Sequence, residues 1–239
     1  MELSSAHELF RSEQHPDSLD EKFHLFGRSN ILNVIYWDIF FREIEILPKG
    51  LIIECGVGRG RSLIIILALE DYYARLNQRS IREVFALDSF DGFPQPTIED
   101  ISPRDPKKGE WSNSPTGRYE YSPKFLEEVL SLSKVTHDNL KIVKGFFNET
   151  MGTLPKSPIS LLHLDGDLYE SYKSPLSLLS EYIQIGGIIV IDDFLVRANN
   201  SQMESFPGAR RAVMEFLDSN KNFEYLVSIR GTPYLRRMS

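Results

Sequence analysis

The feature that most restricts the fold of this chain is a set of five short apolar runs without hydrophobic alternation. They occupy Leu51–Val57, Val84–Leu87, Leu140–Val143, Ile159–Leu164 and Gly187–Ile191. Short runs rich in Ile, Val and Leu are typical of parallel strands that are buried on both faces. Helical segments separate the runs, and the repeated strand–helix–strand order predicts a doubly wound α/β sheet with helices on both faces.

Three of the intervening segments are expected to be helices, namely Ser62–Asn77, Pro123–Leu132 and Tyr169–Ile183. Pro175 lies inside the last of them, so we expect that helix to start nearer Ser174. After the fifth run, the segments Phe223–Ser228 and Pro233–Arg236 are joined at Gly231, and they predict a C-terminal antiparallel hairpin.

Residues 1–48 are expected to form an N-terminal helical extension, and residues 49–239 the single domain that contains the sheet. Residues 31–46 are apolar nearly all round, which is typical of a helix buried against a core or a second subunit. A homodimer is therefore expected. Pro48 and Gly50 then end the helical pattern.

The loop from about 91 to 123 is rich in proline and glycine and is longer than most structureless connections. Trp111, Tyr119 and Tyr121 give it side chains to bury, so we interpret it as a lid. A disordered surface insertion is the alternative.

Charge and cysteine content narrow the function classes. The chain has 27 Lys and Arg against 34 Asp and Glu, a net charge of −7, which argues against a nucleic-acid-binding surface. The single cysteine, Cys55, excludes an intrachain disulfide and favours a reducing compartment. There is no apolar run of membrane-spanning length and no signal-peptide pattern, so a cytoplasmic protein that binds no membrane is expected.

A glycine-rich turn, Glu54-Cys55-Gly56-Val57-Gly58-Arg59-Gly60-Arg61-Ser62, follows the first run. Glycines let the backbone approach a ligand closely, and the start of the next helix offers free N–H groups. Arg61 stands where a dinucleotide fingerprint has its third small residue, so the loop fits a ligand resting on the glycines better than a pyrophosphate. Asp88 ends the second run, where a carboxylate can accept both ribose hydroxyls or can cap a turn.

Acidic residues follow the last two parallel runs: Asp165 and Asp167 after one, Asp192 and Asp193 after the other. These strand ends should face one cleft, where four carboxylates repel one another unless a cation or bound protons compensate. Oxygen ligands favour Mg²⁺ or Ca²⁺. The alternative is that some of these residues cap helices or turns. His163 is expected to be a core histidine rather than a base.

The order and spacing of these motifs resemble the macrocin O-methyltransferase (TylF-type) family, metal-dependent enzymes that methylate sugar hydroxyls in natural products. The similar stretches are LIIECGVGRGRS (51–62), ALDSFDGFP (86–94), KGFFNETMGTLP (144–155), LLHLDGDLYES (161–171), GGIIVIDDF (186–194) and PGARRAVMEFL (207–217). One departure is Gly-Arg-Gly-Arg at positions 58–61, where the family commonly has W-R-G-G.

The resemblance implies a Rossmann-like class I methyltransferase fold that binds S-adenosylmethionine and acts on a sugar or glycosylated metabolite. Its cofactor-binding residues would be Glu54, Cys55, Gly56, Val57, Gly58, Ser62, Asp88, Ser89, Gly145, Phe146 and Asp165. It also implies that Asp165, Asp192 and Asp193 bind Mg²⁺, and that Asp167 is the general base, assisted in catalysis by Asp165.

Two other functions stay open from the residues themselves. One is an oxidoreductase or hydroxylase-like enzyme of the same fold, using a nicotinamide cofactor or iron; Arg61 and the lack of a two-His, one-carboxylate pattern count against it. The other is a non-catalytic binding module, which the repulsion among the aspartates disfavours.

Overall fold

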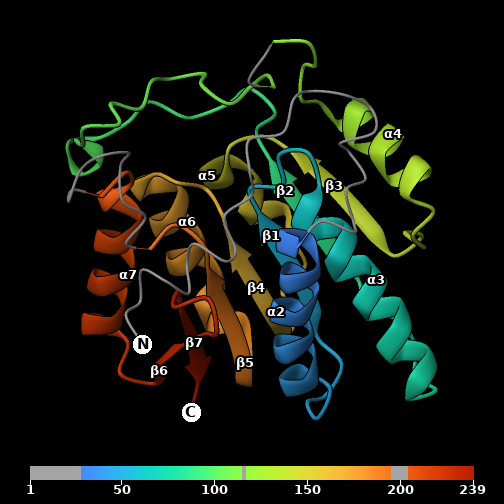
Figure 1. Cartoon of the computed structure of the whole chain (residues 1–239). Coiled ribbons are helices and arrows are strands. Elements are labelled where there is room, and N and C mark those ends of the chain that lie inside the picture. The colour runs from blue at the N-terminus through green and yellow to red at the C-terminus, as the bar shows by residue number, and fades with distance from the viewer. Residues whose placement is uncertain (1–27, 115–116, 195–203) are drawn as a thin grey trace.

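The computed structural model describes residues 28–114, 117–194 and 204–239. Its sheet has seven strands in the order β3-β2-β1-β4-β5-β7-β6 (Figure 1). The strands are β1 (Leu51–Cys55), β2 (Val84–Asp88), β3 (Leu140–Lys144), β4 (Ile159–Leu164), β5 (Ile183–Ile191), β6 (Phe223–Val227) and β7 (Pro233–Arg237). Strands β1 to β5 are parallel, and β6 and β7 form the antiparallel hairpin at one edge, as the sequence predicts.

Helices cover both faces of the sheet. They are α2 (Arg28–Ile44), α3 (Arg61–Leu76), α4 (Pro123–Ser133), α5 (Phe147–Thr150), α6 (Tyr169–Leu179) and α7 (Pro207–Ser219), with short 3₁₀ turns η2 (Ile98–Asp100), η3 (Met151–Thr153) and η4 (Ser180–Tyr182). One hydrophobic core joins the sheet to α2, α3 and α4, and a second joins it to α6 and α7. The order of strands reverses between β1 and β4, and α/β sheets bind ligands at the carboxyl ends of such strands.

Helix α6 begins at Tyr169 and not near Ser174, so the expected effect of Pro175 was wrong. Proline inside a helix removes one backbone hydrogen bond. Burial of the α6 face that carries Tyr172 and Leu176 offsets this loss. The first turn is also capped from outside, because the backbone N–H of Tyr169 donates to the carboxylate of Asp100 at 2.7 Å.

The sequence patterns did not indicate helix α7, and they placed the start of β5 four residues too late, at Gly187. The buried face of α7 carries Gly208, Ala209, Ala212, Val213 and Phe216 at helical spacing, so an amphipathic pattern is present in the sequence and was overlooked. Strand β5 begins at Ile183, before a shift in its register with β4.

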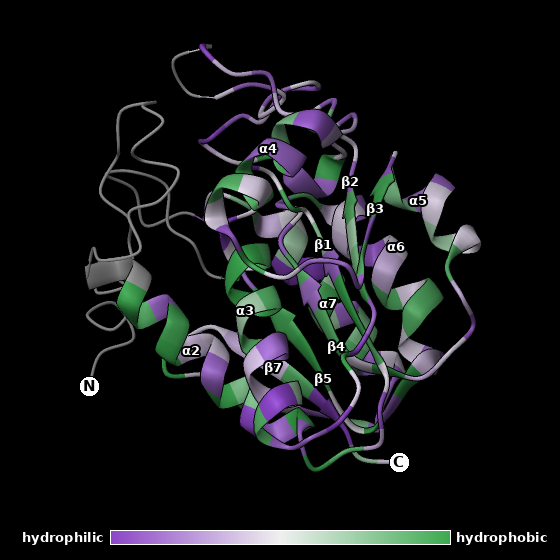
Figure 2. Cartoon of the chain, turned by 90° about the vertical axis from the view of Figure 1, so that its right-hand side faces the viewer, coloured by the Kyte–Doolittle hydropathy of each residue, from purple (hydrophilic) through white to green (hydrophobic). Residues whose placement is uncertain are grey.

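Helix α2 is the described part of the expected N-terminal extension; residues 1–27 lie outside the described residues. Its inner face is buried, whereas Ile31, Val34 and Ile35 are 38–48% exposed. Figure 2 shows α2 at the rim of the molecule, with hydrophobic residues along much of its length. A boundary near residue 48 and a homodimer stay predictions. Within the described ranges, no helix has the length and apolar character needed to cross a membrane.

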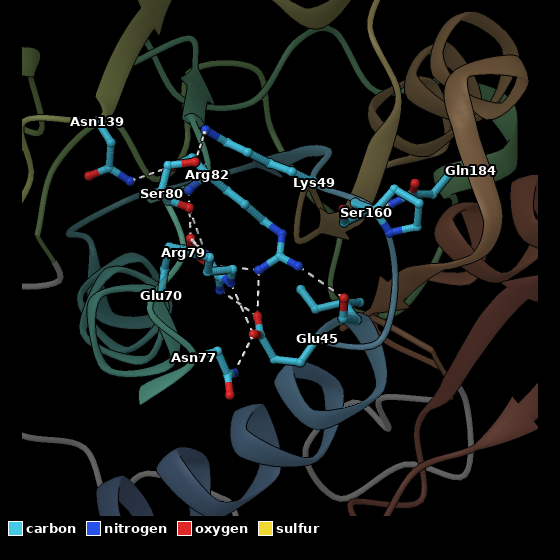
Figure 3. Close-up of polar contacts among 12 residues, drawn as sticks. Glu45, Lys49, Glu70, Asn77, Arg79, Ser80, Arg82, Asn139, Ser160 and Gln184 are labelled. Carbon is cyan, nitrogen blue, oxygen red and sulfur yellow. Dashed lines mark hydrogen bonds and ion pairs between the residues drawn. The ribbon is translucent and has the colours of Figure 1, made fainter. Parts of the chain in front are cut away.

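A buried ion-pair network fastens α2 to α3 and to the segment before β2 (Figure 3). Arg82, 1% exposed, contacts Glu45 at 2.5 Å and Glu70 at 3.2 Å, and its second guanidinium nitrogen donates to the carbonyl oxygen of Ile44 at 3.0 Å. Arg79 donates to both carboxylates as well. Two carboxylates thus face two guanidinium groups, which compensates the buried charges, although Nε of Arg82 has no hydrogen-bond partner among the described residues.

The network predicts a pH-dependent contribution to stability. Burial alone would raise the pKa of Glu45, but hydrogen bonds from Arg79 and Arg82 outweigh it and lower the pKa from 4.5 to about 2. The ionised Glu45 therefore stabilises the fold above about pH 5, and this contribution is lost as the pH falls towards 2. We expect Glu45→Gln to lower the free energy of unfolding at pH 7 by about 2–3 kcal/mol.

Urea unfolding at pH 7 and pH 3 measures this effect, and the difference between wild type and Glu45→Gln should shrink at the lower pH. The control is Glu83→Gln, which removes an exposed pair with Lys141 and should cost less than about 1 kcal/mol. A Glu45→Gln difference of the same size at both pH values would contradict the assignment.

Candidate active site

A cavity of about 850 Å³ lies at the carboxyl ends of the parallel strands. The loops after β1, β2, β4 and β5 line it, together with Asn33 and Trp37 of α2 and with Arg230 from the turn between β6 and β7. Its volume is in the range that small-molecule and cofactor sites occupy in proteins.

The glycine-rich turn shapes one wall of the cavity. Gly56 has a φ of 92°, and a Cβ placed on it would lie 1.8 Å from the backbone oxygen of Asp165. Only glycine therefore lets this turn pack against the end of β4. A Cβ on Gly58 would meet no atom within 4 Å, so the turn has open space above it where a ligand can approach the backbone.

Asp88 fixes the conformation of this turn. One carboxylate oxygen accepts hydrogen bonds from the backbone N–H groups of Val57 (2.9 Å) and Gly58 (2.8 Å), and the other accepts one from Phe90 (2.7 Å). A carboxylate oxygen can accept about two hydrogen bonds, so the second oxygen has capacity for a ligand hydroxyl. The structure thus gives Asp88 the turn-capping role that the sequence analysis named as the alternative, and leaves acceptor capacity for a ligand as well.

A buried pair that the sequence analysis missed lies beneath the turn. Glu54 of β1 and His163 of β4 are register partners, and Nδ1 of His163 lies 3.0 Å from a carboxylate oxygen of Glu54. The same oxygen accepts a hydrogen bond from the Ser62 hydroxyl. The second oxygen of Glu54 and Nε2 of His163 are buried without a hydrogen-bond partner among the described residues. His163 is buried and pairs with Glu54, as expected of a core histidine, but it also borders the cavity, meets Trp37 edge-on and leaves Nε2 without a partner among the described residues.

The predicted metal ligands converge. Asp165, Asp192 and Asp193 each bring a carboxylate oxygen within 4.8 Å of the others. Asp167 lies beside them with a φ of 61°, a left-handed conformation that Asp tolerates better than most residues, and its backbone N–H donates to Asp193 at 2.9 Å. The alternative in which these residues only cap turns does not describe this arrangement.

Burial and repulsion from neighbouring carboxylates raise the pKa of three of these groups, Asp165, Asp167 and Asp193. Burial, and then the charges of Asp192 and Asp193, raise the pKa of Asp165 well above 3.8. The same causes raise the pKa of Asp167, and burial with Asp192 raises that of Asp193 to about 6. The cost of holding these groups ionised together is what a bound dication would remove.

Tyr172 of α6 joins the ends of β4 and β5 behind the carboxylates. Its hydroxyl lies 2.8 Å from the backbone oxygen of Leu164 and 3.0 Å from the carboxylate of Asp193, and it accepts the backbone N–H of Asp193 at 3.0 Å. Burial, and then the charge of Asp193, raise the pKa of Tyr172 well above 10, so the hydroxyl keeps its proton. The side chain therefore fixes the orientation of Asp193.

The expected lid covers the cavity through Phe93, Trp111 and Tyr121. Tyr121 is buried, whereas Trp111 is 51% exposed. Asp100 anchors the segment, because it accepts hydrogen bonds from the Thr97 backbone and from the first residue of α6. The description as a disordered insertion therefore does not fit the described part of this loop, while its movement stays a prediction.

Most of the predicted cofactor and metal residues border this cavity: Gly56, Val57, Gly58, Ser62, Asp88, Ser89, Phe146, Asp165, Asp167, Asp192 and Asp193. Cys55 does not border it; its side chain is buried in the core, and burial raises the pKa of its thiol well above 9. Glu54 and Gly145 are not in the lining either, and the backbone N–H of Gly145 donates to the backbone oxygen of Asp88.

Solved structures place this fold among the Rossmann-like methyltransferases. CalS11, a calicheamicin methyltransferase, aligns with a TM-score of 0.70 at 24% identity, over 98% of this chain and 90% of that one. A second structure of CalS11 in its apo form, described as a TDP-rhamnose 3'-O-methyltransferase, aligns at 0.62 and 23% identity, over 98% and 92%.

The chain belongs to the macrocin-O-methyltransferase (TylF) family, whose model matches residues 39–228. Mycinamicin III 3''-O-methyltransferase of Micromonospora griseorubida is 28% identical over 189 residues, 79% of this chain and 68% of that protein. The 8-demethyl-8-(2,3-dimethoxy-alpha-L-rhamnosyl)-tetracenomycin-C 4'-O-methyltransferase of Streptomyces olivaceus is 28% identical over 160 residues, 66% and 58% of the two chains. The match thus spans between about half and two thirds of these relatives.

Family membership makes this chain an O-methyltransferase, an enzyme that methylates hydroxyl groups. The two other functions that the residues left open, an oxidoreductase-like enzyme and a non-catalytic binding module, are therefore set aside.

The contacts of Tyr172 predict a loss of metal affinity in Tyr172→Phe. Without the hydroxyl, the backbone N–H of Asp193 loses its partner and the Asp193 carboxylate loses a hydrogen bond. Partners of metal ligands typically contribute 10- to 100-fold to affinity, so we expect Mn²⁺ or Mg²⁺ to bind about tenfold more weakly by calorimetry. Tyr72→Phe, which changes an exposed ring on α3, is the control, and equal metal affinity in both variants would contradict the role.

Proposed function

We propose that this chain is an S-adenosylmethionine- and Mg²⁺-dependent O-methyltransferase that methylates a hydroxyl of a sugar or glycosylated natural product. The observation that carries the proposal is the gathering of Asp165, Asp192 and Asp193 within 4.8 Å in the cavity that the glycine-rich turn also lines. Such an arrangement can hold a dication next to a small-molecule methyl donor.

The turn and its surroundings fit the methyl donor. Open space above Gly58 and the remaining acceptor capacity of Asp88 suit a nucleoside ribose, and the buried unpartnered atoms of Glu54 and His163 suit polar hydrogens such as those of an ammonium group. S-adenosylmethionine, when bound, would supply a methyl group on a positively charged sulfur. The residues of the turn would hold it so that this methyl group faces the aspartates.

Asp165, Asp192 and Asp193 would bind Mg²⁺, which prefers carboxylate oxygens. The ion would lower the pKa of an acceptor hydroxyl and neutralise the charge that burial concentrates here. The chain has to place the acceptor oxygen about 3 Å from the methyl carbon and in line with the bond that breaks.

Asp167 is the residue that would take the proton of the acceptor hydroxyl. Burial, and then the charges of Asp193 and Asp192, raise its pKa when no ion is bound. A carboxylate that lies beside the metal-binding group is of the residue type that serves as a general base. Its backbone N–H, held by Asp193, keeps the side chain at the edge of the metal-binding group. The Asp167 carboxylate would hold this proton, while the C–O bond that forms would replace the methyl–sulfur bond of the donor, which would leave as S-adenosylhomocysteine.

The relatives support a sugar as the acceptor. One is named for mycinamicin III, one for a rhamnosyl tetracenomycin, and CalS11 is described as acting on TDP-rhamnose. Both a finished glycoside and a sugar nucleotide are thus represented. We further propose a cytoplasmic homodimer that engages neither nucleic acid nor membrane, on the grounds of the single cysteine, the negative net charge and the exposed apolar residues of α2.

Asp167→Asn tests the proton acceptor. Asn tolerates the left-handed φ of 61° as Asp does, and the backbone N–H to Asp193 is kept, so the fold should not change. We expect turnover to fall by about 10²–10⁴-fold while S-adenosylhomocysteine binds with unchanged affinity. The control is Asp218→Asn, an 81% exposed side chain on α7. Near-normal turnover of Asp167→Asn would remove this residue from its role.

Chelation tests the metal. EDTA should abolish methylation, and Mg²⁺ should restore it, because the carboxylates alone cannot acidify the acceptor hydroxyl. Addition of Mg²⁺ should also raise the melting temperature of the wild-type protein, since it relieves repulsion among the aspartates of the folded state. Methylation that persists in EDTA would rule out the metal.

A further inference from the structure

Three arginines line the same cavity as the aspartates. Arg59 belongs to the glycine-rich turn, Arg61 is the first residue of α3, and Arg230 comes from the turn between β6 and β7. The proposed methyl transfer gives none of them a role. They concentrate positive charge in one place in a chain whose net charge is −7.

The three guanidinium groups are close enough to influence one another. Burial, and then the charges of Arg59 and Arg230, lower the pKa of Arg61. Arg230 is paired with Asp192 at 2.7 Å and lies over the ring of Tyr36 at 4.8 Å. Arg59 is exposed and forms no ion pair within the described residues. Burial alone would lower the pKa of Arg230, but Asp192 and Asp165 outweigh it and raise this pKa, so the repulsion that a bound anion would relieve acts mainly on Arg61 and Arg59.

The positions of Arg61 and Arg230 in the cavity also favour a bound anion. Arg61 stands where the loop pattern of the resemblance has a glycine, so this chain adds a guanidinium to the cavity wall. Arg230 touches Asp192, one of the proposed metal ligands, so the arginines adjoin the reacting centre. A ligand that spans both groups would present a hydroxyl to the aspartates and an anion to the arginines.

We propose that Arg59, Arg61 and Arg230 form an anion-binding subsite, and that the acceptor is a sugar carrying a diphosphate, a nucleoside diphosphate sugar rather than a neutral glycoside. The planar guanidinium fork binds phosphate oxygens through two parallel hydrogen bonds, which is the chemistry that selects arginine for such sites. This inference rests on the proposed function, because it names the acceptor of that same site.

Calorimetry on the full chain with thymidine diphosphate as the probe tests the subsite. Saturating S-adenosylhomocysteine is present to fill the donor site, and EDTA is present so that a divalent ion cannot recruit the phosphates. We expect thymidine diphosphate to bind, thymidine not to bind, and Arg61→Gln to weaken thymidine diphosphate at least about tenfold. Arg59→Gln changes an exposed side chain and should also weaken thymidine diphosphate binding.

The matched control is Arg75→Gln, which removes an exposed arginine from the other end of the same helix and should leave binding unchanged. Glucuronate, a sugar carboxylate, is the competing source of negative charge. Glucuronate binding that is as sensitive to Arg61→Gln as thymidine diphosphate binding would overturn the assignment to phosphate.

Two further outcomes would overturn the inference. Arg61→Gln could weaken S-adenosylhomocysteine instead of thymidine diphosphate, which would assign the arginines to the carboxylate of the methyl donor. Wild-type protein could bind S-adenosylhomocysteine but not thymidine diphosphate, which would reject the subsite and leave the proposed function standing. Failure to bind S-adenosylhomocysteine at all would instead count against the proposed function.

Discussion

The rest of the site depends on the repulsion among carboxylates held at the ends of β4 and β5. Asp165, Asp192 and Asp193 lie within 4.8 Å of one another, and the fold keeps them there with neutral or positive partners. Tyr172 and the backbone N–H of Asp167 hold Asp193, while Arg230 holds Asp192. The free energy that this arrangement costs is supplied by the two hydrophobic cores on either side of the sheet.

The acidic and the basic side chains that line the cavity come from different elements of the fold. Carboxylates occupy the strand ends, whereas the arginines come from a loop, a helix start and a hairpin turn that surround them. Helix α2 brings Trp37 and Asn33 to the cavity, and the buried network of Glu45, Arg79 and Arg82 anchors this helix at its far end. A network remote from the aspartates thus helps to set the shape of the wall that an acceptor would meet.

The sequence allowed the parallel strands to be predicted because their apolar runs are short, continuous and bounded by polar residues. The convergence of the aspartates also followed, since strand ends of a parallel sheet share one edge. What could not be predicted depends on pairs distant along the chain. Glu54 meets His163 only through the register of β1 with β4, and Arg230 meets Asp192 across 38 positions. Helix α7 was missed although its buried residues, Val213 and Phe216 among them, recur at helical spacing.

The contact between Asp100 and the first residue of α6 has a mechanical consequence. Asp100 is 2% exposed, and its carboxylate accepts hydrogen bonds from both the loop and the helix. A Cβ on Gly208 would lie 2.0 Å from this carboxylate, so only glycine fits at position 208. Swinging the whole loop outward would strip a buried cap from the helix that follows Asp167. Movement of the loop residues after Asp100 would keep this cap, whereas movement of residues 97–100 would lose it. The part of the loop up to Asp100 is therefore the fixed side of the entrance to the cavity.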